Sequence, residues 1–228
     1  KDVPVTAHAD SFLKIEVEED IGPKTKGYYC SVIAILMLFL QLSKDDSEKW
    51  ISKILGTIDV IPDIAKTTKQ WYESEKEELK RFKNIIVIGY DKCLPAATEG
   101  ALKILETVQC CVRYYELEEF MHGIYHGIDK STLILALGNQ SRHLNRMVRL
   151  LGYLKEHKNA TTYLISQNKV TEHDFSYPFI EDSLFVSFEY LTVLQVLGEL
   201  MCHDRGVDLY DTADENFHEY MESYVYEK

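Results

Sequence analysis

The chain alternates between short apolar runs and longer segments in which apolar residues recur every three or four positions. The most apolar runs lie at residues 85–90, 132–137 and 161–165, and a more mixed run lies at residues 111–115. Aliphatic runs of this length are typical of buried parallel strands, and the periodic segments between them are typical of helices. The alternation predicts an α/β fold, a three-layer αβα sandwich around a mainly parallel sheet.

Segments outside this alternation predict further elements. Residues 12–17 alternate apolar and polar over most of their length, which indicates a half-exposed strand. The charge run at residues 73–81 is expected to be a solvated helix face. Outside the strands we expect helices up to about Leu42, over 47–55, from Pro62 onward, over 142–157 and over 185–202.

Three charged residues follow the first strand at helical spacing. Glu99, Lys103 and Glu106 are four and three positions apart, so their side chains project from one helix face. His122 follows sixteen residues after Glu106, and a carboxylate with an imidazole suits proton transfer at neutral pH. The alternative is that these charged residues are simply the solvated face of the helix, with an ordinary i,i+4 ion pair between Glu99 and Lys103. The opposite, sheet-packing face is expected to hold Ala101, Leu102, Leu105 and Val108.

The region from residue 99 to residue 123 resembles the signature of the sugar isomerase (SIS) domain family. Residues 100–103 with Glu106, then residues 118–120 running into His122 and Gly123, follow the family pattern at the family spacing. This family includes the isomerase half of glucosamine-6-phosphate synthase and the fructosamine-6-phosphate deglycases. The resemblance implies that Glu106 carries a proton between C1 and C2 of a sugar phosphate, that His122 opens the ring, and that Lys103 lines the same site.

A second resemblance concerns the start of the chain. Residues 18–26 resemble the closing part of a first SIS domain, which implies that Gly22 and Thr25 lie near the sugar. Plain turn and N-cap chemistry would explain both residues equally well. We therefore expect a flavodoxin-like SIS architecture in three parts: a remnant of a first SIS domain at 1–43, a helical connector at 44–83 and a second SIS domain at 84–228. The resemblance implies that the phosphate-binding loop belongs to the part of the first domain that is missing from this fragment.

Charge and cysteine content restrict the partners and the compartment. The net charge of −12 and the pI near 5.1 argue against nucleic acid as a partner. The longest apolar run, residues 32–40, is about half a membrane span and predicts a buried helix, so we expect no membrane partner. An odd number of cysteines without C-x-x-C spacing indicates reduced thiols in the cytoplasm; they are Cys30, Cys93, Cys110, Cys111 and Cys202.

Two further patterns could hold a ligand. His122 and His126 are four apart, but Gly123 and Gly127 disfavour a regular helix there and no third metal ligand is evident, so we expect neither a metal nor an organic cofactor. The loop at residues 138–141 precedes a helix and could hold an anion. Ser141 is also a good N-cap, and we favour that interpretation.

The leading functional hypothesis is a deglycase or isomerase that acts on a 6-phosphofructosamine as a homodimer, because the resemblance implies that the histidine comes from a neighbouring subunit. Glucosamine-6-phosphate synthases use a lysine near the C-terminus, whereas residues 215–226 contain none and Lys228 alone remains. The proline usual after the His-Gly pair is replaced by Ile124. The alternatives are amination or isomerisation of fructose 6-phosphate and a sugar-phosphate sensor without catalysis.

Overall fold

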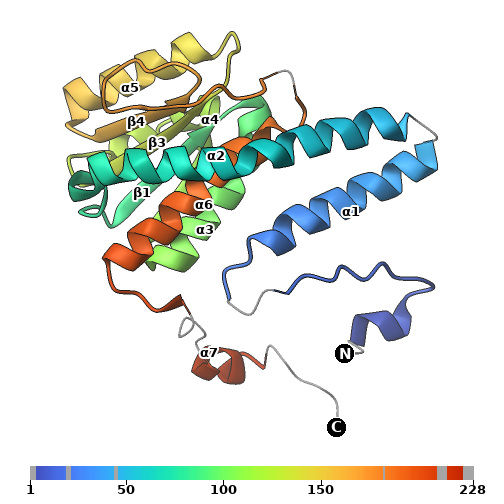
Figure 1. Cartoon of the computed structure of the whole chain (residues 1–228). Coiled ribbons are helices and arrows are strands. Elements are labelled where there is room, and N and C mark those ends of the chain that lie inside the picture. The colour runs from blue at the N-terminus through green and yellow to red at the C-terminus, as the bar shows by residue number, and fades with distance from the viewer. Residues whose placement is uncertain (1–3, 19–21, 44–45, 182, 210–214, 223–228) are drawn as a thin grey trace.

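A five-stranded parallel sheet forms the centre of the computed structural model, which describes residues 4–18, 22–43, 46–181, 183–209 and 215–222 (Figure 1). The strand order is β2-β1-β3-β4-β5, and each neighbouring pair is parallel. This confirms the predicted α/β class. The strands are β1 (Asn84–Gly89), β2 (Cys111–Glu116), β3 (Thr132–Gly138), β4 (Thr161–Ser166) and β5 (Phe175–Ser176), the last of which the apolar pattern did not predict.

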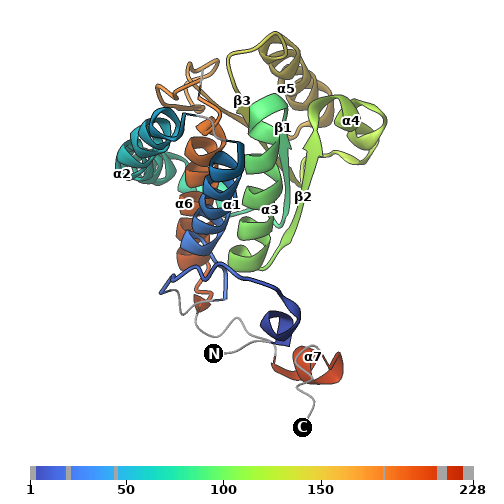
Figure 2. The ribbon, with the colours of Figure 1, turned by 90° about the vertical axis from the view of Figure 1, so that its right-hand side faces the viewer.

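Helices cover both faces of the sheet. The α-helices are α1 (Lys26–Ser43), α2 (Ser47–Leu79), α3 (Leu94–Val108), α4 (Leu117–Met121), α5 (Leu144–Lys158), α6 (Val186–Asp204) and α7 (Glu215–Tyr220). Short 3-10 helices lie at Pro4–His8, Asp91–Cys93 and Ile124–Gly127. In Figure 2, α3 and α6 lie on one side of the sheet and α4 and α5 on the other.

The two sheet faces bury alternate residues of each strand. On β1, Ile85 and Val87 join the core that also contains residues of α2, α3 and α6. Ile86 and Ile88 join the core that contains residues of α4 and α5. Because successive strand side chains point to opposite faces, a strand covered on both sides must be apolar throughout. This explains why β1 and β3 have nearly continuous aliphatic sequences.

Helices α3 and α6 approach each other closely at two glycines. A Cβ on Gly100 would lie 2.8 Å from the Cβ of Leu194, and a Cβ on Gly198 would lie 2.9 Å from Thr107 Oγ1. Real Cβ atoms essentially never come within 3.0 Å of another heavy atom. The absence of a side chain at these positions therefore lets the two helix backbones pack directly together.

Helix α2 is one continuous helix, although the sequence predicted two with a break at Pro62. Proline inside a helix removes a hydrogen bond and costs about 3 kcal/mol. The buried side chains of α2 nevertheless follow one helical stripe through that point, from Ile54 and Thr57 to Ile64 and Thr68. We attribute the continuity to this stripe, which packs against the domain on both sides of Pro62.

The predicted strand at residues 12–17 is wrong, because residues 11–18 form no strand and most of their side chains are exposed. An alternating pattern becomes a strand where a neighbouring strand can pair with it, and the described residues offer none to this segment. The start of the described chain is a short 3-10 helix, Pro4–His8.

Helix α1 confirms the predicted helix but not its burial. Leu40 is the buried residue of α1, whereas Ile35, Phe39 and Leu42 are 57%, 63% and 70% exposed. Among the described helices α1 is the one whose length and composition would allow it to cross a membrane, a test that core helices and signal sequences also pass. Several large apolar side chains of α1 are thus left exposed within the described chain.

The α3 and α6 contact generates a stability prediction. Replacing Gly100 by Ala should lower the free energy of unfolding by about 1–3 kcal/mol, because the new methyl group collides with Leu194. Gly152 on α5 is the matched control, since a Cβ there meets no atom within 4 Å. Gly152→Ala should leave stability unchanged or raise it by up to about 1 kcal/mol. Urea unfolding of both variants measures this, and equal stabilities would contradict the close packing.

Candidate functional site

The structure brings together the three charged residues that the helical spacing predicted. Lys103 Nζ lies 2.7 Å from Glu106 Oε2 and 3.5 Å from Glu99 Oε1. The Lys103 side chain is 7% exposed, that of Glu99 15% and that of Glu106 35%. A solvated stripe does not describe this face, because its central ammonium group is buried. We call these three residues the acid-base face of α3.

The orientation of α3 explains why a charged residue is buried. The expected sheet-packing residues Leu102 and Leu105 are 45% and 41% exposed, so that part of the prediction is wrong. Gly100 packs on Leu194, while Ile104 and Thr107 lie against Gly198. These close contacts at the two glycines fix the rotation of α3 about its own axis. In this orientation Lys103, which follows Gly100 by about one turn, points inward. A buried ammonium group is stable only when it is paired, and the two carboxylates pair it.

Burial dominates the electrostatics of Glu99. Desolvation raises the pKa of its carboxyl group above the ordinary value, Lys103 opposes this shift, and the negative charge of Glu106 adds to it. The pKa values of Tyr28 and Tyr29 are also raised, mainly by burial and to a smaller extent by the charge of Glu99. This coupling indicates that the first turn of α1 lies beside the acid-base face.

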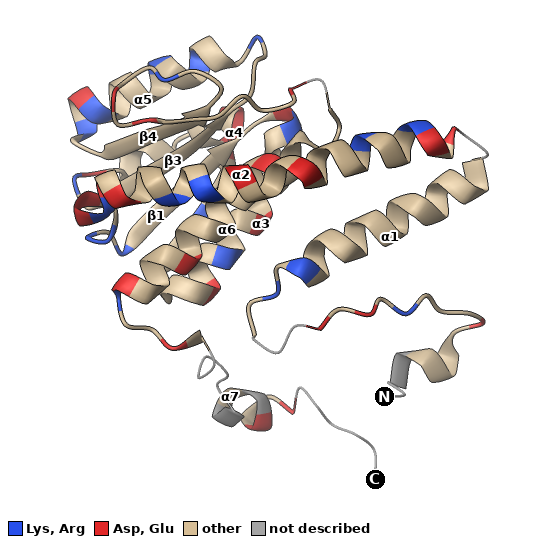
Figure 3. Cartoon of the chain, in the orientation of Figure 1, with Lys and Arg blue, Asp and Glu red and all other residues tan. Residues whose placement is uncertain are grey.

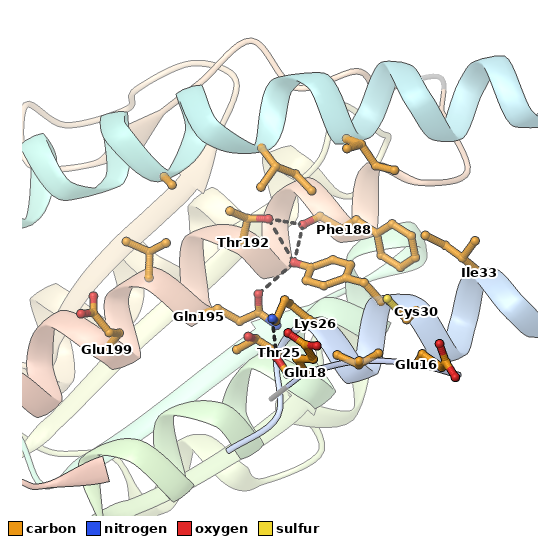
Figure 4. Close-up of a pocket in the computed structure, with 16 residues that line it drawn as sticks. Glu16, Glu18, Thr25, Lys26, Cys30, Ile33, Phe188, Thr192, Gln195 and Glu199 are labelled. Atoms are coloured by element: carbon orange, nitrogen blue, oxygen red, sulfur yellow. Dashed lines mark hydrogen bonds between the residues drawn. The ribbon is translucent and has the colours of Figure 1, made fainter. Parts of the chain in front are cut away.

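A cavity of about 900 Å³ lies among α1, α2, α6 and residues 16–18 (Figure 4). Thr25 lines it, as does Tyr29, whose hydroxyl group donates to Gln195 Oε1 at 3.0 Å. Gly22 is exposed and is not among the lining residues. Of the two residues expected near the sugar at the start of the chain, the structure therefore places one at a cavity and one outside it.

His122 lies near the carboxyl end of β2, whereas Glu106 lies near the amino end of that strand. It caps the C-terminus of α4, which begins directly after β2 ends, and its side chain is exposed. Glu106 belongs to the last turn of α3, which leads into the start of β2. The six residues of β2 span about 20 Å. Figure 2 shows α4 at the far end of β2 from the end of α3. One copy of the chain therefore keeps the carboxylate of Glu106 and the imidazole of His122 apart.

The other candidate ligand positions take local structural roles. Gly123 has φ of 130°, so no regular helix joins His122 to His126, and the described residues contain no group of three or more potential metal ligands. Ser141 is not the N-cap of α5: that position is His143, whose backbone N–H donates to Ser141 Oγ at 3.1 Å. The alternative C-terminal lysine, Lys228, lies outside the described residues.

Sequence reasoning did not identify three residues near the candidate site: Tyr28, Tyr29 and Gln195. Tyr28 and Tyr29 sit at the start of an apolar helix, where aromatic residues normally indicate packing. Gln195 lies inside the apolar helix α6, and its Nε2 is buried without a hydrogen-bond partner among the described residues. A polar residue in the middle of an apolar helix was the one available signal for Gln195.

The acid-base face generates a prediction about pH. Lys103→Met should raise the pKa of Glu99 further, because the ammonium group that favours its charged form is removed. A carboxyl group with a raised folded pKa stabilises the fold at low pH, and this contribution is lost as pH rises through the unfolded and then the folded pKa. The variant should therefore lose more unfolding free energy at about pH 7.5 than at about pH 5.

Lys80→Met is the matched control, because Lys80 pairs with Glu77 at 2.6 Å and the two side chains are 36% and 77% exposed. Its effect should be small and similar at both pH values. Urea unfolding measures the free energies, and carboxyl ¹³C NMR titration measures the pKa of Glu99. A pKa of Glu99 that does not change in Lys103→Met would show that the two groups are not coupled.

Comparison with known proteins supports this architecture. Residues 78–172 match the model of the SIS domain. The chain is 26% identical over 196 residues to glutamine–fructose-6-phosphate aminotransferase [isomerizing] of Wigglesworthia glossinidia brevipalpis, which covers 81% of this chain and 32% of that protein. The chain thus spans about a third of the length of such curated relatives.

Two solved structures extend the comparison. A Clostridium difficile 630 protein assigned as a phosphosugar isomerase is 29% identical, with a TM-score of 0.87 over 97% of this chain and 65% of its own. A Salmonella typhimurium LT2 protein assigned as a sugar binding protein is 30% identical, with a TM-score of 0.69 over 77% of this chain and 56% of its own. The chain therefore carries a SIS domain, homologous to the isomerase part of the glutamine–fructose-6-phosphate aminotransferases.

Proposed function

We propose that this chain belongs to a phosphosugar isomerase of deglycase type, which converts a 6-phosphofructosamine to glucose 6-phosphate and a free amine or amino acid. The observation that carries the proposal is the buried Lys103 held between Glu99 and Glu106. A paired ammonium group beside a partly exposed carboxylate is a suitable arrangement for moving a proton next to developing negative charge. A solvated helix would need no such pairing.

In the proposed reaction His122 first assists ring opening by transferring a proton between the ring oxygen and the anomeric hydroxyl group. Glu106 then removes a proton from C1 of the open-chain ketosamine and returns it to C2, while the C2 oxygen gains a proton and the amine nitrogen loses one, so that no net proton is added or lost. The product carries an imine at C1, and addition of water releases the amine and leaves the aldehyde of glucose 6-phosphate. Lys103 pairs with Glu106 and stabilises the enolate-like intermediate.

The site is proposed to form between two copies of the chain. Glu106 and His122 lie at opposite ends of β2, so a single copy cannot place both on one hexose. A two-fold symmetric dimer creates two equivalent contacts and would bring each His122 to the Glu106 of the other copy. The side chain of His122 is exposed and thus available to a partner.

Residues 1–43 are proposed to be the closing part of a first SIS domain, residues 44–83 a helical connector and residues 84–228 the second SIS domain. The exposed apolar side of α1 supports this division, because contiguous apolar surface of this kind marks a contact with another folded unit. We also propose a cytoplasmic location, supported by the absence of disulfides among the five cysteines.

A second candidate within the same class is isomerisation or amination of fructose 6-phosphate. The names of the relatives favour it, since they include isomerizing aminotransferases and a phosphosugar isomerase. The absence of lysine from residues 215–226 favours the deglycase. A sugar-phosphate sensor is the candidate from another class, and a ligand-dependent rise in thermal stability without turnover of any of these substrates would identify it.

The catalytic proposal predicts the effect of removing the carboxylate. Glu106→Gln should lower the release of glucose 6-phosphate from fructosamine 6-phosphates by roughly a hundredfold to ten thousandfold, because an amide cannot accept the C1 proton. Glu77→Gln, on the exposed end of α2, is the control and should keep full activity. A steady-state assay of the full-length protein measures the release of glucose 6-phosphate. A Glu106→Gln variant with wild-type turnover would disprove the catalytic role of Glu106.

The shared site predicts complementation between two inactive variants. Glu106→Gln and His122→Asn homodimers should each be inactive, but heterodimers formed by co-expression should contain one intact site of two. Random pairing would then restore up to about a quarter of the wild-type activity. If both residues of a site came from the same copy, no pairing would produce an intact site, and the mixture would stay inactive.

A further inference from the structure

A second recess lies at the amino ends of β1 and β3. Its volume is about 440 Å³, and we call it the basic edge pocket; it is lined by Arg81, Phe82, Lys83, Asn84, Lys130 and Ser131. Three of these residues lie in the turn between α2 and β1, Asn84 is the first residue of β1, and the other two lie in the turn before β3. Figure 3 shows Lys and Arg in the turns at the start of β1. The pocket shares no residue with the acid-base face.

The charge of this pocket is opposite to that of the whole chain. Three of its six lining residues are cationic and none is a carboxylate, although the chain carries a net charge of −12. Two further guanidinium groups hydrogen-bond to lining residues. Arg113 Nη2 donates to Asn84 Oδ1 at 2.7 Å, and Arg205 Nη2 donates to the backbone carbonyl of Phe82. Positive charge thus gathers at this point of an acidic surface.

The backbone carbonyls that would repel an anion here already have donors. A helix C-terminus carries partial negative charge on its last carbonyl groups, and α2 ends beside the pocket. Arg205 also donates to the carbonyl of Lys80 at 3.1 Å, and the carbonyl of Lys83 accepts from the N–H of Cys111 at 3.0 Å. The adverse field of the helix end is therefore reduced where the pocket opens.

Two carboxylates lie near the pocket, and both are engaged. Glu78 pairs with Arg81 at 2.5 Å. Asp129 accepts from the N–H of Ser131 at 2.8 Å and from its hydroxyl group at 2.6 Å, and these hydrogen bonds lower the pKa of its carboxyl group. The ammonium groups of Lys83 and Lys130 have neither an ion pair nor a hydrogen bond within the described residues. They are the donors that remain for a ligand.

From this geometry we propose that the basic edge pocket binds a small phosphorylated metabolite through its phosphate group. Lys83 and Lys130 contact the phosphate oxygens, whereas Arg81 stays paired with Glu78. A volume of about 440 Å³ exceeds that of a phosphate and leaves room for a sugar-sized remainder. The binding is charge-dominated, so it weakens as the salt concentration rises.

Titration of the ¹⁵N-labelled full-length protein with inorganic phosphate, at ionic strength held constant with sodium chloride, tests this proposal. Saturable backbone NMR shifts should appear at Lys83, Asn84 and Ser131. The double variant Lys83→Ala with Lys130→Ala should weaken phosphate binding at least roughly tenfold, since it removes two charge contacts. The control replaces two exposed lysines of α2, Lys66 and Lys69, by Ala and should bind as the wild type does.

Three results would overturn the proposal: shifts that sodium chloride alone reproduces, shifts confined to the region of Thr25 and α3, or unchanged binding in the double variant. Circular dichroism first verifies that the double variant is folded, and a variant that is not folded is replaced by Lys83→Gln with Lys130→Gln. Glu106→Gln separates this proposal from the enzymatic one. It should retain phosphate binding at the basic edge pocket whether or not it loses turnover.

Discussion

The close contact between α3 and α6 is the constraint on which the candidate site depends. Gly100 and Gly198 let the two helices approach until the side chains of Leu194 and Thr107 fill the space that a Cβ would need. This approach sets the rotation of α3, and the rotation decides that Lys103 points inward while Leu102 is exposed. Once the ammonium group is buried, its two carboxylate partners are required for stability. Packing between apolar helices thus creates the electrostatics of the site.

Much of the fold could be predicted from the sequence because the strands are buried on both faces and therefore almost uniformly apolar. Helical spacing also showed that Glu99, Lys103 and Glu106 share a face. It could not show which face packs, since that depends on Leu194, a residue far along the chain. The same limit explains residues 12–17, whose alternating pattern had no strand to pair with, and Pro62, whose helix is maintained by contacts that no local pattern contains.

The roles of Glu106 and His122 rest on a different kind of inference. Their spacing of sixteen residues has no meaning on a single helix or strand, and it was the family resemblance that connected them. The structure adds that β2 lies between them in the chain, so Glu106 lies near the amino ends of the strands and His122 near their carboxyl ends. Tyr28, Tyr29 and Gln195 could not be assigned in advance, because they lie within apolar helices where packing is the usual explanation.

The central claim is that one copy supplies the carboxylate and another the imidazole to a single sugar phosphate. A crystal structure of the full-length protein with a bound, non-reactive ketose 6-phosphate analogue tests it most directly, through the positions of all copies of Glu106 and His122 around the ligand. We expect the ligand to contact Glu106 of one copy and His122 of its partner. A ligand that contacts Glu106 and His122 of the same copy, or that contacts no His122 of any copy, would contradict it.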